Sequence, residues 1–338
     1  MSCFRDFRCI AERCRHSCCA GWEIDVDEES FQRYQRLSGP FAETLRSSIF
    51  TEPDGSHHYN LTPDGRCPHL RPDGLCRQIL ELGEESLCEI CANHPRFFHR
   101  FGDVEEQGVG LACEEAARLL FTDPNPLTLV EEGHDDGMPF EEEALYRLLL
   151  DWRAECLVAA ADGELSIYER LGEVLSLGRQ ADNALWGAQW DTVPPEVVPG
   201  HALLWLDRLT ELESVDGEWT GTLGDALAAA EYPELLEEFA LDADSRQYDR
   251  LLTYYLFRFA LESVWDANAK RWADFIVFAV LTVELLDFGR WLKNGCRFSA
   301  QDRQDMARIF SKEFEYDSEL AEKLDALTEG IAIFDSAD

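Results

Sequence analysis

Cysteines are the residues of this chain whose type and spacing indicate a particular chemistry. The 338 residues include 12 cysteines, and most of them lie in the first third of the chain. Several come in pairs that are close in sequence, and such pairs bring thiolates to one point, as metal ligation requires. The predicted metal ligands are Cys9, Cys14, Cys18, Cys19, Cys67, Cys76, Cys88, Cys91 and Cys113.

The spacing of these cysteines leaves the identity of the metal open. A zinc ion takes a closed tetrahedron of ligands, whereas an iron–sulfur cube takes one thiolate at each iron. Thiolates of either arrangement can come from pairs such as those seen here. The remaining cysteines, Cys3, Cys156 and Cys296, are expected to be buried structural thiols.

The composition restricts the partners and the compartment. Asp and Glu outnumber Lys and Arg by 67 to 30, which gives a formal net charge of −37. Such a surface repels phosphates, so we expect no nucleic-acid partner. The N-terminus has no apolar signal segment, and the apolar run at 275–281 is too short to span a bilayer. We therefore expect a cytoplasmic protein without a membrane partner, in which reduced thiols favour metal ligation over disulfides.

The hydrophobic pattern predicts a mainly α fold in two parts joined by a linker. Residues 1–121 are irregular and rich in cysteines and turn signals, which predicts a metal-binding domain with small β-hairpins. Residues 122–140 carry prolines, glycines and an acidic run typical of a linker. Residues 141–338 repeat apolar residues at helical spacing, which predicts an α-helical bundle.

Local patterns predict how the cysteine pairs are positioned. Cys14 and Cys18 are four residues apart, so on a helix they would share one face. Cys88 and Cys91 would share one face of a short helix that Ser86 begins.

A Pro-Asp-Gly turn at 72–74 lies between Cys67 and Cys76. If Leu70 pairs with Leu75 across this turn, both thiols come to the same face of a small ribbon. A second Pro-Asp-Gly turn lies a few residues before this one. Asp25 and its neighbour Asp27 alternate around an apolar residue, which is typical of a solvated strand face.

An ordered set of motifs accompanies the cysteines over residues 7–121. In chain order they are Phe7-Arg8-Cys9-Ile10, Cys14, Cys18-Cys19-Ala20-Gly21-Trp22, Gly65-Arg66-Cys67-Pro68-His69-Leu70, Gly74-Leu75-Cys76, Leu82-Gly83-Glu84-Glu85-Ser86-Leu87-Cys88-Glu89-Ile90-Cys91, His94-Pro95-Arg96-Phe97 and Leu111-Ala112-Cys113-Glu114-Glu115-Ala116-Ala117-Arg118. With these residues in this order, the segment resembles the flagellin lysine-N-methylase family. The resemblance covers about a third of the chain, and the rest is similar only in being helical.

The resemblance implies an enzyme that transfers methyl groups from S-adenosylmethionine to lysine side chains of flagellin. It also implies an iron–sulfur cluster, and the type expected first is 4Fe-4S. Zinc is the alternative metal. Arg96 is a candidate for binding the carboxylate of S-adenosylmethionine through its planar fork, and the alternative is a surface ion pair. Trp22 is a candidate for stacking on the adenine, and the alternative is an apolar cover over the cluster. No residue stands out as the catalytic base.

Two other functions stay open from the sequence, a non-enzymatic metal-binding scaffold and a redox protein. The chain has neither a G-x-G-x-G loop after a strand nor a C-x-x-x-C-x-x-C run, so two common S-adenosylmethionine-binding motifs are absent. We expect the cysteine-rich part to dock on the bundle, with the catalytic pocket in the cleft between them. Residues 95–97 would face S-adenosylmethionine there, and acidic side chains of the bundle would receive the lysine.

Overall fold

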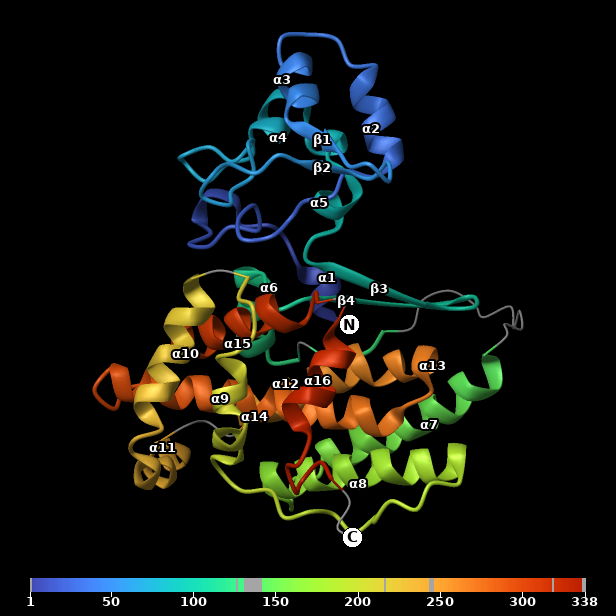
Figure 1. The fold of residues 1–338 in the computed structure, drawn as a ribbon, viewed down its shortest axis with the longest axis vertical. Helices are drawn as coiled ribbons and strands as arrows, with labels where there is room; N and C mark the ends of the chain where they lie inside the picture. Colours follow the sequence, from blue (N-terminus) through green and yellow to red (C-terminus); the bar gives the residue numbers. More distant parts are fainter. Residues whose placement is uncertain are drawn as a thin grey trace.

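The chain folds into a small lobe that lies on a larger helical body, as Figure 1 shows for this computed structural model. The structure describes residues 2–125, 127–130, 142–215, 217–242, 246–317 and 319–335. Each of the two parts has its own cluster of buried apolar side chains. Among the described helices, none combines the length and the apolar character that a bilayer crossing requires.

The small lobe consists of short elements around a compact core that includes Tyr34 and Tyr59. Asp27 organises two of its helices, because its carboxylate accepts hydrogen bonds from the backbone N–H groups of Ser30 and Glu89, both at 2.8 Å. The strands β1 and β2 pair antiparallel. The elements are η1 (Ala11–Arg13), α2 (Glu28–Gln35), α3 (Ala42–Ser47), β1 (Ile49–Thr51), β2 (His57–Tyr59), α4 (Arg77–Leu82), η2 (Glu84–Ser86) and α5 (Glu89–Asn93).

Part of the N-terminal third packs into the core of the helical body. The strands β3 and β4 form an antiparallel hairpin, and Phe97 and Phe101 on β3 are buried among bundle residues. Arg153 of α7 donates to Glu106 of β4 at 2.7 Å, which fastens the hairpin to the bundle. The elements concerned are α1 (Ser2–Asp6), β3 (Arg96–Phe101), β4 (Val104–Val109) and α6 (Glu114–Thr122).

The rest of the body is a helical bundle around the long helix α14, which packs against α8, α10, α12 and α15. This helix is buried along most of its length, as expected for a helix that others surround. Gly289 of α14 lies against the backbone of Ala226 on α10, so the two helices approach closely. The elements are α7 (Glu143–Ala160), α8 (Ile167–Trp186), η3 (His201–Leu204), α9 (Leu206–Leu209), α10 (Gly217–Ala229), η4 (Pro233–Leu235), α11 (Leu236–Asp242), α12 (Arg246–Phe259), η5 (Ala260–Glu262), α13 (Ser263–Asp266), α14 (Ala269–Lys293), α15 (Ala300–Phe314) and α16 (Leu320–Thr328).

The helix α14 also carries the buried carboxyl groups of Asp274, Glu284 and Asp287. Asp287 forms an ion pair with Arg303 of α15 and accepts a hydrogen bond from the Tyr248 hydroxyl at 2.9 Å. Burial raises the pKa of each of these carboxyl groups to about 7. They therefore change protonation near neutral pH.

The mainly α prediction is confirmed, and the helical pattern predicted over 141–338 includes the long helices α7 and α14. The helix expected to carry Cys14 and Cys18 was wrong. Cys14 is extended after η1 and Cys18 lies in a turn, because the Arg15 N–H between them donates to a carboxylate of α6 instead of continuing a helix.

The predicted ribbon near the cysteines has a different register. Leu70 forms its bridge with Cys76 and not with Leu75, because the Arg71 N–H takes the Leu75 carbonyl in a tight turn. The expectation of a buried Cys296 was also wrong, since this residue is exposed after α14.

The domain limits 1–121, 122–140 and 141–338 stay a prediction. Most of the expected linker, namely 126 and 131–140, lies outside the described residues. The hydrophobic packing places α1, β3, β4 and α6 with the helical body.

Candidate functional site

The predicted ligand thiols lie in two neighbourhoods. Cys67 and Cys88 are buried in the core of the small lobe, and Cys19 and Cys91 pack against it. The Cys67 N–H donates to the Cys19 carbonyl at 2.8 Å, which joins the two segments. Cys76 interacts electrostatically with Cys19 and Cys88. We call these five residues the small-lobe thiols.

Hydrogen bonds between thiols favour the thiolate form at two positions. A hydrogen bond with Cys91 lowers the pKa of Cys88, although burial opposes the shift. A hydrogen bond with Cys18, whose sulfur lies 3.9 Å away, lowers the pKa of Cys19 to about 7. The thiolate is the ligating form, so this donor chemistry suits a metal centre. Within the described residues, however, no three Cys, His, Asp or Glu side chains are arranged as a metal site.

The other predicted ligands, Cys9, Cys14, Cys18 and Cys113, interact electrostatically at the junction with the helical body. Cys14 Sγ lies 3.5 Å from Oε2 of Glu114 on α6. Burial raises the pKa of Cys14 to about 12 and that of Cys113 to about 11. Both thiols are therefore protonated at neutral pH unless a metal displaces the proton.

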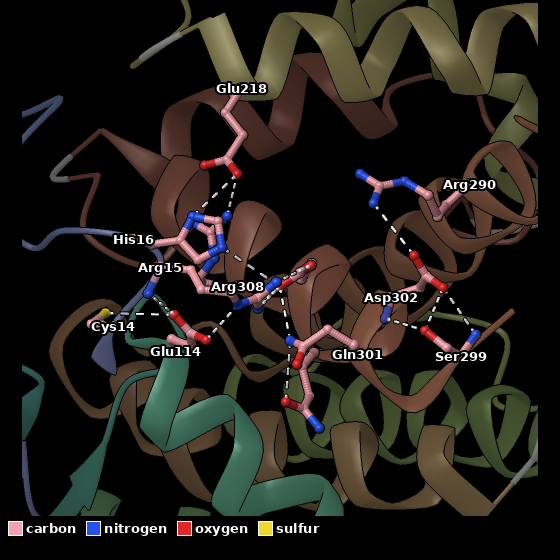
Figure 2. Close-up of polar contacts among 12 residues, drawn as sticks. Cys14, Arg15, His16, Glu114, Glu218, Arg290, Ser299, Gln301, Asp302 and Arg308 are labelled. Carbon is pink, nitrogen blue, oxygen red and sulfur yellow. Dashed lines mark hydrogen bonds and ion pairs between the residues drawn. The ribbon is translucent and has the colours of Figure 1, made fainter. Parts of the chain in front are cut away.

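Two side chains before the Cys-Cys doublet fasten its loop to the helical body. Arg15 donates to Glu114 and to Asp305 of α15, both at 2.7 Å. His16 Nδ1 lies 3.6 Å from Glu218 of α10. Figure 2 shows Arg15 and His16 reaching toward these helices. The position of the doublet thus depends on the fold of the body.

A pocket of about 620 Å³ lies at the junction of the two parts. Its walls come from the segment before α2, the turn between β1 and β2, the helix α5, the start of β3 and a residue that follows α15. A volume of this size is typical of small-molecule sites. The charged residues that line it are Asp25, Asp27, Glu28, Glu89 and Arg96.

Arg96 lines this pocket, and its guanidinium lies beside the aromatic rings at α1. The group lies 5.7 Å from the ring centroid of Phe4 and 5.1 Å from that of Phe7. No hydrogen bond or ion pair of the Arg96 side chain is found in the described part of the chain. Arg100, further along β3, instead pairs with Glu105. The N–H donors of Arg96 thus have no protein partner among the described residues.

A buried ion pair lies behind the pocket. Arg258 of α12 is 3.1 Å from Glu315, and its guanidinium lies over the rings of Phe97 and Tyr316 at 4.4 and 5.0 Å. His94 lines the pocket, and its Nε2 is buried without a hydrogen-bond partner among the residues described. Burial and the nearby Arg258 lower the pKa of His94 to about 4, so the imidazole is neutral at pH 7.

The pocket agrees with the expected cleft in part. Arg96 lines it, and Trp22 backs it, with its ring 5.6 Å from that of His94 and 5.5 Å from that of Tyr316. The binding of S-adenosylmethionine by Arg96 and Trp22 stays a prediction. The expectation that bundle carboxylates would line the pocket was wrong, since its lining carboxylates come from the small lobe.

Several lining residues gave no sequence signal of their own. Glu89 and His94 lie at the two ends of α5, and Tyr316 follows α15, so long-range packing is needed to bring Tyr316 to the other two. Asp25 and Asp27 lie as predicted on one side of a strand-like segment, but that side faces the pocket. The nearest available signal was the position of Glu89 and His94 inside the cysteine motifs.

The fold and the site define a mainly α protein in which a cysteine-rich lobe and a helical body share a pocket. Comparison with curated proteins then confirms the resemblance to the flagellin lysine-N-methylase family. The lysine-N-methylases of Salmonella typhimurium and Salmonella choleraesuis are each 29% identical to this chain over 131 residues, which is 37% of this chain and 33% of theirs. The flagellar biosynthetic protein FliU of Salmonella muenchen is 28% identical over 131 residues, which is 78% of its length.

The similarity is thus partial on both sides. The matched segment spans about a third of the length of the two lysine-N-methylases. No family model matches the chain, and no solved structure matches it.

Proposed function

We propose that this protein is an S-adenosylmethionine-dependent lysine N-methyltransferase that acts on flagellin and carries a thiolate-held iron–sulfur cluster. The observation that carries the proposal is the junction pocket, which combines an unpaired guanidinium with carboxylates of the small lobe. The names of the similar proteins supply the class of reaction.

The reaction requires a neutral amine at the sulfonium methyl group. A lysine ammonium has an ordinary pKa of about 10.4, so it must lose a proton before its nitrogen can attack. The attack forms the N–C bond and breaks the S–C bond of the sulfonium, which leaves a neutral thioether and a positively charged methylammonium. Carboxylates that line the pocket favour the charged form of an incoming lysine, so its proton passes to one of them or to water before the nitrogen attacks.

Arg96 has the chemistry to hold the methionine part of S-adenosylmethionine. A planar guanidinium binds a carboxylate through paired N–H donors, and the donors of Arg96 have no other partner in the described residues. The apolar and aromatic side chains of Phe97, Phe98 and Tyr316 line the same pocket. Aromatic faces attract a cation such as a sulfonium.

Calorimetric binding of S-adenosylmethionine tests this role. Charge-assisted hydrogen bonds contribute about 1.5–3 kcal/mol, so Arg96→Leu should weaken binding by roughly 10- to 100-fold. Arg100→Leu is the matched control on the same strand, and it should change the affinity less than about twofold because Arg100 is exposed and paired with Glu105.

Decarboxylated S-adenosylmethionine provides the second arm of this test. It lacks the carboxylate, so it should bind the wild-type protein and Arg96→Leu equally. If Arg96→Leu binds S-adenosylmethionine and its decarboxylated form with the same loss of affinity, then Arg96 does not contact the carboxylate. Absence of methyl transfer to flagellin by the wild-type protein would overturn the proposed activity.

The small-lobe thiols would hold the cluster. An iron–sulfur cluster supplies redox-active iron whose potential depends on its thiolate ligands and surroundings. The role of this chain is to present thiolates, and the lowered pKa values of Cys88 and Cys19 favour that form. Anaerobically purified protein should contain iron and sulfide and absorb broadly near about 400 nm. If the purified protein is colourless and contains zinc instead of iron, the proposed cluster is wrong and the site is a zinc site.

A further inference from the structure

The junction pocket contains two kinds of carboxylate, and only one kind is available to a ligand. Asp27 is occupied by the backbone N–H groups of Ser30 and Glu89, and these bonds hold its pKa below the usual range although burial opposes them. Glu28 accepts hydrogen bonds from Gln32 at 2.8 Å and contacts His57 at 3.1 Å. Both groups therefore serve the fold of the lobe.

The carboxylates of Asp25 and Glu89 are different. Each is exposed, and neither side chain has a hydrogen bond or ion pair among the residues that the structure describes. The segment before α2 is joined to the start of α5 by the hydrogen bond from the Glu89 N–H to Asp27. Asp25 and Asp27 lie two residues apart on a strand-like segment, so they point to the same side. The two free carboxylates thus line one wall of the pocket.

Apolar side chains accompany these carboxylates. Ile90 follows Glu89 on α5 and is 48% exposed, and Phe98 on β3 is 40% exposed. A lysine side chain combines an apolar four-carbon stem with a terminal ammonium, and it buries the stem while the charge meets polar groups. The wall therefore matches both ends of a lysine side chain.

An independent observation in the same pocket also indicates a donor ligand. His94 Nε2 is buried, lacks a hydrogen-bond partner in the described part of the chain, and belongs to a neutral imidazole. Buried polar atoms are normally satisfied, so this unpaired ring nitrogen suits a polar ligand, and in the tautomer with the proton on Nδ1 it can accept an N–H group. An ammonium brings such donors and a positive charge.

We propose that this wall binds the side chain of the substrate lysine, with the carboxylates of Asp25 and Glu89 contacting its ammonium and Ile90 and Phe98 packing against its stem. The inference rests on the proposed function for the identity of the acceptor. It divides the pocket in two: Arg96 serves the carboxylate of the methyl donor, and the wall from Asp25 to Glu89 serves the acceptor. Specificity for a cationic side chain then comes from the small lobe.

The experiment uses a blocked lysine, Nα-acetyl-L-lysine N-methylamide, and its neutral Nε-acetyl derivative as probes. Their binding to the full-length protein is titrated by saturation-transfer NMR at about 0.15 M salt, where distant surface charges are screened. The test variant is Asp25→Asn/Glu89→Gln. The control is Glu43→Gln, which neutralises an exposed carboxylate of α3 that does not line the pocket.

Partly exposed charge pairs contribute modestly, so the double variant should bind the blocked lysine about five- to tenfold more weakly than the wild-type protein. The control variant should change the affinity less than about twofold, and the neutral probe should bind both proteins weakly. Equal affinity of the double variant and the wild type overturns the inference. Equal affinity of the wild type for the two probes overturns it as well.

The methyl donor provides the arm that separates this inference from the proposed function. The affinity for S-adenosylmethionine should be unchanged in the double variant, while the KM for flagellin rises by the same factor as the lysine affinity falls. A weaker affinity for S-adenosylmethionine would instead assign Asp25 and Glu89 to the amino group of the donor. If the wild type binds the blocked lysine selectively but transfers no methyl group, the proposed function fails and the lysine site stands.

Discussion

Removal of the Arg258 side chain is predicted to destabilise the junction behind the pocket, and to do so more strongly at high pH. Arg258 and Glu315 form an ion pair at 3.1 Å in which the side chains are 5% and 0% exposed. The Tyr254 hydroxyl also donates to Glu315 at 2.8 Å. Arg258→Leu would leave Glu315 buried with this hydrogen bond but without its cation.

The loss can be sized from the burial of the pair. Removal of one partner of a buried ion pair costs about 3–5 kcal/mol, and the surviving hydrogen bond from Tyr254 places the expected loss near about 3 kcal/mol. Burial already raises the pKa of Glu315 in the wild-type protein, with Arg258 opposing the shift. Without Arg258 this pKa rises further.

The sign of the pH dependence follows from linkage. A carboxyl group whose folded-state pKa is raised stabilises the folded protein below its unfolded pKa and loses that contribution as the pH rises through the folded value. The deficit of Arg258→Leu relative to the wild type should therefore grow between about pH 5 and about pH 8. Asp274, Glu284 and Asp287 titrate in both proteins, so their contributions cancel in the difference.

Urea denaturation followed by circular dichroism at both pH values measures this deficit. The double variant Arg258→Leu/Glu315→Leu should recover more than half of the loss, because it removes the unpaired buried charge. Arg147→Leu is a control, since Arg147 is 68% exposed in its pair with Glu143 and should cost less than about 1 kcal/mol. A deficit that is independent of pH, or no recovery in the double variant, would refute the reasoning.

Two further predictions concern the thiols and the helix packing. Cys88→Ser should lower the iron content of anaerobically purified protein. Cys156→Ala, in the core of the bundle, should leave the iron content unchanged. Full iron occupancy in Cys88→Ser would show that Cys88 is not a ligand. Gly289→Ala should lower the free energy of unfolding by about 1–3 kcal/mol, because the added Cβ would lie 2.7 Å from the Ala226 nitrogen. Gly221→Ala, on an open face of α10, should raise it by up to about 1 kcal/mol, and thermal or urea unfolding that ranks the two variants otherwise would contradict this packing.

Local signals were sufficient for much of the fold. Apolar residues at helical spacing predict α7 and α14 because a helix repeats its buried face at short range. The same kind of signal failed at Cys14 and Cys18, whose four-residue spacing suits a helix. There the Arg15 N–H donates to the carboxylate of Glu114, which lies about a hundred residues further along the chain. That N–H is then not available for a helical hydrogen bond.

The amino-acid order was also sufficient for the family resemblance, since the cysteines and their neighbours follow one another as they do in that family. It was not sufficient for the pocket or for the grouping of the thiols. The Glu89 N–H donates to Asp27, Arg96 begins β3 and lies beside the Phe7 ring, and Tyr316 follows α15. The pocket therefore exists only where the lobe meets the body. Side chains so distant in sequence are brought together by the burial of two hydrophobic cores, and that burial depends on long-range packing that no local spacing encodes.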